Sequence, residues 1–435
     1  MYCQLDTLSR CFPPSIRRVL NELPVTLDDT YERTLQGIPK EKQQHAHRLF
    51  QCLVVAIRPL RVEELAEVFT IEFDAETATN FVEDWRPENP EEAVLSACST
   101  LISVIDDADH KIVQFSHFSV KEFLTSDRFR DSEVASIRLY HIPLFAAHTI
   151  LARACLTVLL QLDEKVDKKR LSKFTLAFYA AQHWVNHAQF EDVASRVEDA
   201  MERLFDPKKP YLAAWTWIHD VDWNVKRIID DLEECPSPPK ATPLYYSTHC
   251  GFTEVAKHLI VTHREDVNAG HGRYGPPLHA ASRNGHLDTA RLLLAHNADV
   301  NSSKRSSIPL RRAYDGRHLE VMRLLLEHGA DVDMRSGYAF GTALHDASYW
   351  GEAEIVQLLL QHGANANAAG VMNQTPLHLC YGANDDYVKV AKLLLEYGAD
   401  MDAKSGISYS AFESAKNKCR QGIVQVMLEY RAKRK

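Results

Sequence analysis

Residues 276–294 have the sequence PPLHAASRNGHLDTARLLL, and this pattern returns along the C-terminal half of the chain. Related copies are TPLYYSTHCGFTEVAKHLI at 242–260, IPLRRAYDGRHLEVMRLLL at 308–326, TALHDASYWGEAEIVQLLL at 342–360, TPLHLCYGANDDYVKVAKLLL at 375–395 and, more weakly, YSAFESAKNKCRQGIVQVML at 409–428. The position of the proline is taken by Pro243, Pro277, Pro309, Ala343, Pro376 and Ala411, in steps of 34, 32, 34, 33 and 35 residues. A period of this length predicts a stack of repeat units.

Each copy contains the residues that two short helices and a tight turn require. Thr242 and Thr375 stand where a side-chain cap begins a helix, and the proline that follows suits the first helical position. Leucines of the first helix and the LLL run of the second are expected to share a core. Gly285 and Gly351 permit the turn between the two helices. We expect left-handed caps after the second helix at Gly329, Gly363 and Gly398.

The period and the TPLH signature strongly resemble the ankyrin family, and the resemblance covers residues 241–435 with about six repeats. The motif histidines are expected to tie adjacent repeats by hydrogen bonds and not to bind a metal; they are His279, His345 and His378. The third repeat departs from the pattern because Arg311 replaces the histidine and the glycine is shifted to Gly316. The fifth repeat carries two extra residues around 382–386.

The ankyrin resemblance implies a protein partner, because such arrays bind through a concave surface made of inner helices and loop tips. Tyr349 and Trp350 follow the motif on an inner helix and have no obvious core role, although Trp350 covering the next repeat is an alternative. The predicted partner-binding residues are Arg283, Asn284, Asp315, Tyr349 and Trp350 on inner helices and Lys304, Arg305, Arg335, Tyr338, Phe340 and Met372 at loop tips.

The first 250 residues differ sharply from the array in composition. They contain one glycine, Gly37, of the 17 in the chain. Phosphate-binding loops, dinucleotide fingerprints and nucleophile elbows need glycine at tight turns, so ATPase, dinucleotide-dependent and α/β-hydrolase activities are disfavoured. Residues 1–240 have a net charge of −11 and residues 241–435 a net charge of +2, which argues against a broad nucleic-acid-binding face in the first half.

The nine cysteines occur singly, without a CxxC pair, as in a reduced protein. The sequence shows neither a secretory signal nor an apolar stretch of the roughly 20 residues that a membrane span needs. We therefore expect a protein of the cytoplasm or the nucleus with no membrane partner. His183 and His187 stand four residues apart, but no third ligand accompanies them, and we predict neither a metal nor a cofactor.

Residues 41–130 predict a winged-helix domain. Helical segments around 44–57, 62–69 and 91–100 precede two β-like runs at 101–105 and 111–116, and another helix begins near Ser119. The third helix has no Lys or Arg, so a winged-helix transcription regulator ranks low and no nucleic-acid partner is expected. Residues 131–234 are expected to form a helical domain, with helical spacing at Val193, Val197, Met201 and Leu204, and residues 235–240, CPSPPK, a linker.

The segment FSHFSVKEFL at 115–124 is similar to the F-x-H-x-[ST]-x-x-E-[FY] motif in the winged helix of NACHT-type signalling ATPases. Residues 1–235 look like the segment that follows the NACHT core in fungal NACHT–ankyrin proteins, whose winged helix is often labelled after GPI inositol-deacylase. The resemblance implies that His117 senses the β-phosphate of ADP, while Glu122 and Phe123 pack the following helix. A structural role for His117 is the alternative. The label implies no enzyme, because no G-x-S-x-G motif is present.

These observations predict a mostly α fold with a winged-helix domain, a helical domain and an ankyrin-repeat solenoid. Residues 1–40 would be a helical remnant after a NACHT ATPase core, whose phosphate loop would precede Met1. We expect a non-enzymatic interaction and regulatory module, the sensor half of a NACHT–ankyrin protein of non-self recognition, which docks against an ATPase core in cis or in trans. The alternative is a free-standing ankyrin adaptor that recruits substrates to another enzyme.

Overall fold

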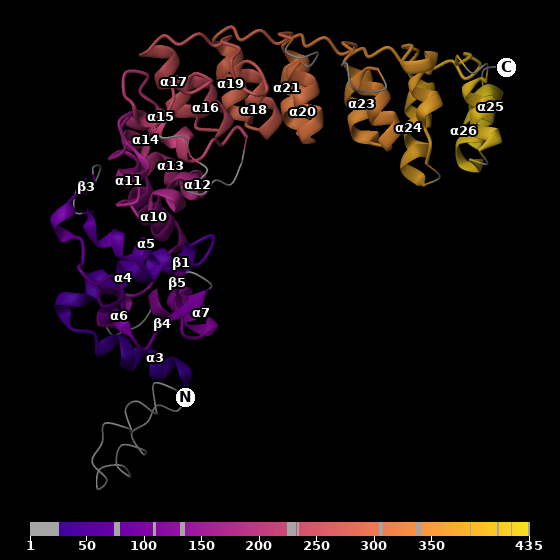
Figure 1. The fold of residues 1–435 in the computed structure, drawn as a ribbon. Coiled ribbons are helices and arrows are strands. Elements are labelled where there is room, and N and C mark those ends of the chain that lie inside the picture. The colour runs from indigo at the N-terminus through magenta and orange to yellow at the C-terminus, as the bar shows by residue number, and fades with distance from the viewer. Residues whose placement is uncertain are drawn as a thin grey trace. The chain divides into compact units, whose positions relative to one another are not determined.

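The computed structural model of the chain describes residues 26–73, 79–107, 110–130, 135–223, 232, 235–303, 308–335, 341–382, 384–406, 409–418 and 420–433. The chain divides into two compact units, Met1–Pro239 and Lys240–Lys435. Each unit has a buried apolar core of its own, and helices predominate in both (Figure 1). The mostly α fold that the sequence predicts is confirmed.

The N-terminal part of the first unit combines short helices with a small antiparallel sheet (Figure 1). Its elements are α3 (Leu27–Gln36), α4 (Lys40–Val55), β1 (Leu60–Arg61), α5 (Val62–Glu67), η2 (Val68–Thr70), β2 (Ile71–Glu72), β3 (Asn80–Phe81), η3 (Glu83–Trp85), α6 (Pro90–Cys98), β4 (Ile102–Asp107), β5 (His110–Phe115), α7 (Phe118–Thr125), α8 (Asp127–Arg130) and α9 (Ala135–Arg138).

Strand β5 is the centre of the main sheet, with β1 on one side and β4 on the other. Val113 of β5 pairs with Leu60 of β1 and with Val104 of β4, and Val113 and Leu60 are buried. The sequence predicted the β4–β5 pair and helices at α4, α5, α6 and α7, which is the arrangement of a winged helix. It did not predict β1, because two residues are too few for an alternating pattern to show.

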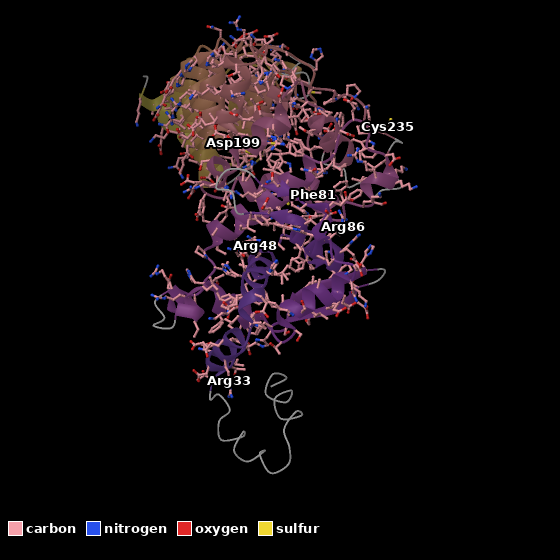
Figure 2. The ribbon with its side chains drawn as sticks, turned by 90° about the vertical axis from the view of Figure 1, so that its left-hand side faces the viewer. Arg33, Arg48, Phe81, Arg86, Asp199 and Cys235 are labelled. Carbon is pink, nitrogen blue, oxygen red and sulfur yellow. The ribbon has the colours of Figure 1, made fainter. Side chains whose placement is uncertain are left out.

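A buried carboxylate fixes α5 against the helical region that follows. Oε2 of Glu67 accepts hydrogen bonds from the N–H of Leu176 at 2.5 Å and from Oγ1 of Thr175 at 2.8 Å. Oε1 of Glu67 pairs with Arg86 at 3.2 Å. The guanidinium carbon of Arg86 lies 5.9 Å from the ring centroid of Phe81, and Figure 2 labels these two residues near each other.

The helical region of the first unit packs around large aromatic side chains. Its helices are α10 (Leu144–Leu159), α11 (Lys168–Leu171), α12 (Ala177–Ala188), α13 (Val193–Arg196), α14 (Glu198–Phe205) and α15 (Tyr211–Ile218). Trp184, Phe205 and Trp215 form a buried group with ring centroids 5.3–6.2 Å apart. The helical spacing predicted at 193–204 is interrupted, because Val197 leaves the helical backbone region (φ −123°, ψ 13°) and separates α13 from α14.

The second unit is an array of helix pairs that follow one another along the chain (Figure 1). The first, inner helices are α16 (Pro243–His249), α18 (Pro277–Asn284), α20 (Pro309–Gly316), α22 (Ala343–Trp350), η6 (Pro376–Leu379) and α25 (Ala411–Asn417). The outer helices are α17 (Thr253–Val261), α19 (Leu287–Ala295), α21 (Leu319–Glu327), α23 (Ala353–Gln361), α24 (Asp385–Glu396) and α26 (Gln421–Lys433), and the short turn η5 (Val371–Asn373) precedes η6.

Backbone conformation at the turns confirms the predicted glycine roles. Gly285 and Gly351 have φ of +77° and +74° between inner and outer helices. The predicted left-handed caps at Gly329, Gly363 and Gly398 have φ of +84°, +86° and +87°. In the third repeat it is Arg317 that adopts a positive φ of +60°, because Gly316 is the last residue of α20.

The motif histidines link repeats as predicted where the cap is threonine. Nδ1 of His345 accepts a hydrogen bond from the N–H of Thr342 at 3.1 Å, and Nε2 lies 3.0 Å from the carbonyl of Ala368. His378 makes the same contacts with Thr375 and with the carbonyl of Tyr409 at 3.2 Å. Within the described ranges, no helix has both the length and the apolar composition that crossing a bilayer requires.

Candidate protein-binding site

The inner helix α22 ends in two aromatic side chains outside the core. Tyr349 and Trp350 are its last residues, and Gly351 turns the chain away at a φ of +74°. The preceding residues of α22, from 343 to 348, are all buried. Trp350 is 60% exposed, which argues against the alternative that it is covered by the next repeat.

Tyr349 joins Trp350 to a third aromatic ring. The ring centroids of Tyr349 and Trp350 are 5.1 Å apart at 89°, and those of Tyr349 and Tyr381 are 5.7 Å apart at 80°. Edge-to-face pairs of this kind are favourable for aromatic rings. Tyr349, Trp350 and Tyr381 are called the aromatic cluster below.

Two cations border the aromatic cluster. Nζ of Lys418 lies 4.0 Å and the guanidinium carbon of Arg420 lies 4.7 Å from the ring centroid of Tyr381. Burial lowers the pKa of both groups, and the charge of Arg420 lowers the pKa of Lys418 further. Arg420 also donates a hydrogen bond to the carbonyl of Cys380 at 2.8 Å. The cluster therefore carries positive charge on one side.

Side chains from the fifth repeat hold the end of α22 in place. The hydroxyl of Tyr387 donates to the carbonyl of Tyr349 at 2.9 Å. The ring of Tyr387 packs so closely that a Cβ added at Gly351 would lie 2.9–3.1 Å from it. Nε2 of Gln374 donates to the hydroxyl of Tyr381 at 3.1 Å. These contacts hold the backbone of Tyr349 and the ring of Tyr381 in place, and with them the aromatic cluster.

The structure brings together residues that the sequence-based prediction missed. Tyr381, Lys418 and Arg420 come from the fifth and sixth repeats, whereas of this group the prediction named only Tyr349 and Trp350. A signal was present at Tyr381, because the corresponding position of the second and fourth repeats holds a serine. The two cations had no such signal, since their proximity depends on how the sixth repeat stacks.

The other predicted inner-helix residues are largely engaged within the array. Asn284 donates from Nδ2 to the carbonyl of His249 at 2.8 Å. The carboxylate of Asp315 accepts a hydrogen bond from Nε of Arg311 at 2.9 Å. Arg283 is half-buried, and its carbonyl lies 3.1 Å from Nε2 of His318.

Of the predicted loop-tip residues, the structure describes Arg335 and Met372. Nη2 of Arg335 donates a hydrogen bond to the carbonyl of Ala369, which ties one tip to the next. Met372 is 68% exposed beside Val371, which is 53% exposed. The remaining predicted tips lie outside the described residues; they are Lys304, Arg305, Tyr338 and Phe340.

His117 caps the N-terminus of α7. Its Nδ1 accepts a hydrogen bond from the N–H of Ser119 at 3.3 Å and lies 2.6 Å from the Ser119 hydroxyl. This arrangement places the imidazole proton on Nε2. Phe123 is buried as expected, but Glu122 is exposed on α7 and packs no helix, contrary to the expectation.

Of the two histidines with metal-ligand spacing, His187 belongs to a chain of hydrogen bonds. Nε2 of His187 lies 2.9 Å from the hydroxyl of Tyr179, and its Nδ1 lies 2.9 Å from Nδ1 of His148. The ring of His183 packs against Tyr179 at 4.8 Å. In the part of the chain that the structure describes, no group of three or more His, Cys, Asp or Glu side chains is placed to hold a metal ion.

Family profiles match both units. The profile of ankyrin repeats in three copies matches residues 217–304, 244–336 and 310–405. The profile of the GPI inositol-deacylase winged helix domain matches residues 31–137.

Among curated relatives, the azaphilone pigments biosynthesis cluster protein L of Monascus ruber is 28% identical over 303 residues, which cover 65% of this chain. The chain matches 61% of the length of that protein. Alpha-latrocrustotoxin-Lt1a of Latrodectus tredecimguttatus is 37% identical over 60 residues, or 14% of this chain and 4% of the toxin.

Among solved structures, an ankyrin repeat protein and an ankyrin repeat domain from Acinetobacter baumannii AYE each match 43% of this chain with a TM-score of 0.40 and 25% identity. The matches cover 96% and 97% of those two chains, respectively. With the repeat pattern, the helix pairs and the two family profiles together, the chain contains ankyrin repeats and a winged-helix domain.

Proposed function

We propose that the chain is a non-enzymatic module whose ankyrin array binds a protein partner on the face formed by the ends of the inner helices. The observation that carries this proposal is the aromatic cluster, in which Trp350 is 60% exposed at the end of a buried helix. Exposed tryptophan and tyrosine beside arginine are the residues that most often dominate binding energy at protein interfaces. Ankyrin repeats are interaction scaffolds, which agrees with this assignment.

The test is the double substitution Tyr349→Ala, Trp350→Ala in the full chain. Because these side chains contribute to binding and not to the core, we expect pull-down of the principal partner from extracts of the organism that encodes the chain to be lost, with the melting temperature nearly unchanged. Loss of a single such anchor typically costs about 2 kcal/mol or more of binding free energy.

Tyr397→Ala is the matched control, because Tyr397 is 47% exposed at the end of the outer helix α24. It should leave partner capture unchanged. If the double variant unfolds, the two aromatic residues are core residues and the binding site moves to the tips near Arg335. If the variant folds and still captures the partner, the proposed site is wrong.

We further propose that the first unit is the sensor half of a NACHT-type signalling protein and docks against an ATPase core, in cis or in trans. The support is the 115–124 motif together with the surface beside it, where Phe118 is 72% exposed next to His117 and Leu27 of α3 is 51% exposed. The buried Tyr31 links α3 to the start of α7 through a 2.9 Å contact with the Ser119 hydroxyl. The free-standing adaptor lacks this docking step and is the rival function.

Nucleotide binding tests whether His117 senses phosphate in this chain alone. Gly37 is the one glycine before Gly251, so this part of the chain cannot form a glycine-rich phosphate loop. We therefore expect no ATP hydrolysis, and ADP binding by calorimetry no tighter than about millimolar. Phosphate sensing by His117 would then need the ATPase core. Micromolar ADP affinity that disappears in His117→Ala would instead show that this chain senses phosphate without a core.

A further inference from the structure

The array carries opposite charges along its length. Residues 271–317 contain eight Lys or Arg and three Asp, whereas residues 341–400 contain two Lys and seven Asp or Glu. The aromatic cluster lies in the acidic part, and the basic part holds the inner helices α18 and α20. Of the seven acidic residues only Asp346 lies on an inner helix, where it is buried and paired with Arg311, so basic side chains dominate the charge that a ligand of the inner helices meets.

Two arginines of the basic part lie over one tyrosine ring, and a third lies near one of them. The guanidinium carbons of Arg273 and Arg312 lie 5.5 Å and 5.4 Å from the ring centroid of Tyr274. The ring of His249 stacks on the same tyrosine, with centroids 5.9 Å apart and planes at 11°. Arg283 is close enough to Arg312 for its charge to act on it. Arg273, Tyr274, Arg283 and Arg312 are called the basic patch below.

Arg312 and Arg283 lack the anionic partners that their neighbour has. Arg311 pairs with Asp315 and with Asp346, whereas neither Arg283 nor Arg312 forms an ion pair with any described residue. Nε of Arg312 is buried and has no hydrogen-bond partner. Burial lowers the pKa of Arg312, the charge of Asp315 opposes this shift without forming an ion pair, and the charge of Arg283 adds to it. An anion beside the two guanidinium groups would offset the repulsion between them.

We propose that the basic patch binds an Asp- or Glu-rich segment of the protein partner, which continues across the inner helices to the aromatic cluster. Arg283 and Tyr349 occupy the same position of their repeats, so the two surfaces belong to one face of the array. This inference rests on the proposed function, because it names the chemistry of the partner that the array binds. Guanidinium groups suit carboxylates, since each can donate two parallel hydrogen bonds.

A short acidic segment fits this face better than a nucleic acid does. A nucleic acid carries charge along its whole length, whereas the basic patch is confined to a few side chains around Tyr274, so most phosphates of a long strand would lie beyond the patch. An acidic segment with an apolar residue at one end places its charge over Arg283 and Arg312 only. Its apolar end can then reach the exposed ring of Trp350.

The test uses fluorescein-labelled hexaglutamate and hexaglutamine peptides with the full chain, followed by fluorescence anisotropy. We expect hexaglutamate to bind at least about tenfold more tightly than hexaglutamine, because only the former offers charge complementarity. The double variant Arg283→Gln, Arg312→Gln should lose about tenfold in affinity for hexaglutamate while keeping the size and polarity of the side chains. Raising the ionic strength from about 0.01 M to about 0.1 M should weaken binding, since it shortens the Debye length from about 30 Å to about 10 Å.

Arg291→Gln, Arg323→Gln is the matched control, because both arginines are exposed on the outer helices α19 and α21 and the change in net charge is the same. It should leave hexaglutamate binding unchanged. Equal binding of the two peptides, an equal loss in the control, or tighter binding of a thymidine oligonucleotide than of hexaglutamate would each overturn the proposal. Tyr349→Ala, Trp350→Ala should leave hexaglutamate binding intact, so a failure of the aromatic site is distinguishable from a failure of the basic patch.

Discussion

The two units differ in how far apart along the chain the residues of their internal contacts lie. In the array, the same contact recurs: a backbone N–H donates to a side chain about one repeat earlier in the chain. Asp299 donates in this way to Asn268, and Asp331 to Asn301. In the first unit, the decisive contacts join distant segments: Leu176 bonds to Glu67 across 109 residues, and Ile57 to Tyr179 across 122. Damage to the array should therefore stay local, whereas damage to the first unit should spread through it.

The largest expected effect is that of Glu67→Ala in the first unit. The substitution removes the acceptor of Leu176 and Thr175 and leaves Arg86 without its carboxylate, so we expect a loss of about 3 kcal/mol or more in the free energy of unfolding. Five of the six tryptophans lie in this unit, so tryptophan fluorescence during urea unfolding follows it. The exposed Glu63→Ala on the same helix is the control. Equal shifts in both variants would contradict the special role of Glu67.

A smaller effect is expected in the array from Gly285→Ala compared with Gly329→Ala. Both glycines have positive φ, +77° and +84°, so each alanine carries backbone strain of about 1 kcal/mol. A Cβ at Gly285 would also lie 2.4–2.8 Å from the ring of His318, whereas nothing lies within 4 Å at Gly329. Thermal unfolding followed by far-UV circular dichroism should rank Gly285→Ala as clearly more destabilising. A larger effect at Gly329 would show that the turn between the helices is not as tight as the structure describes.

The smallest effect concerns acidification of the first unit. Burial lowers the pKa of His47 to about 4 and of His187 to about 3, both below the value of about 6.5 for an unfolded histidine. Their contribution to stability is therefore complete above about pH 6.5 and decreases as the pH falls from there toward about 4. Urea midpoints measured at a series of pH values should fall over this window.

His47→Phe should reduce this pH dependence by about 1 kcal/mol per pH unit, because the ring remains and its titration is removed. At neutral pH the variant should differ little in stability from the original, because it loses the hydrogen bond between the imidazole and the backbone of His141 but also removes the buried Nε2 that has no partner. The exposed His45→Phe on the same helix should leave the slope unchanged. A slope that is the same in all three proteins would exclude His47 as a cause.

The array could be predicted far more completely than the first unit. The TPLH caps, the positive φ at Gly285 and Gly351 and the ties made by His345 and His378 all depend on residues within one repeat or the next. The exposed end of α22 followed from the same reasoning. The approach of Lys418 and Arg420 to Tyr381 could not be predicted, because it depends on how the last two repeats stack.

In the first unit, the sequence by itself determined which segments are helices and that a β-pair follows the third predicted helix, because these are local patterns of apolar and polar residues. Only the tertiary structure decided that Leu60 and Arg61 form a third strand, that α13 and α14 are separate, and that Glu67 meets Leu176. Such contacts are chosen by the packing of segments far apart in the chain, and a contact between distant segments leaves no periodic signal in either of them.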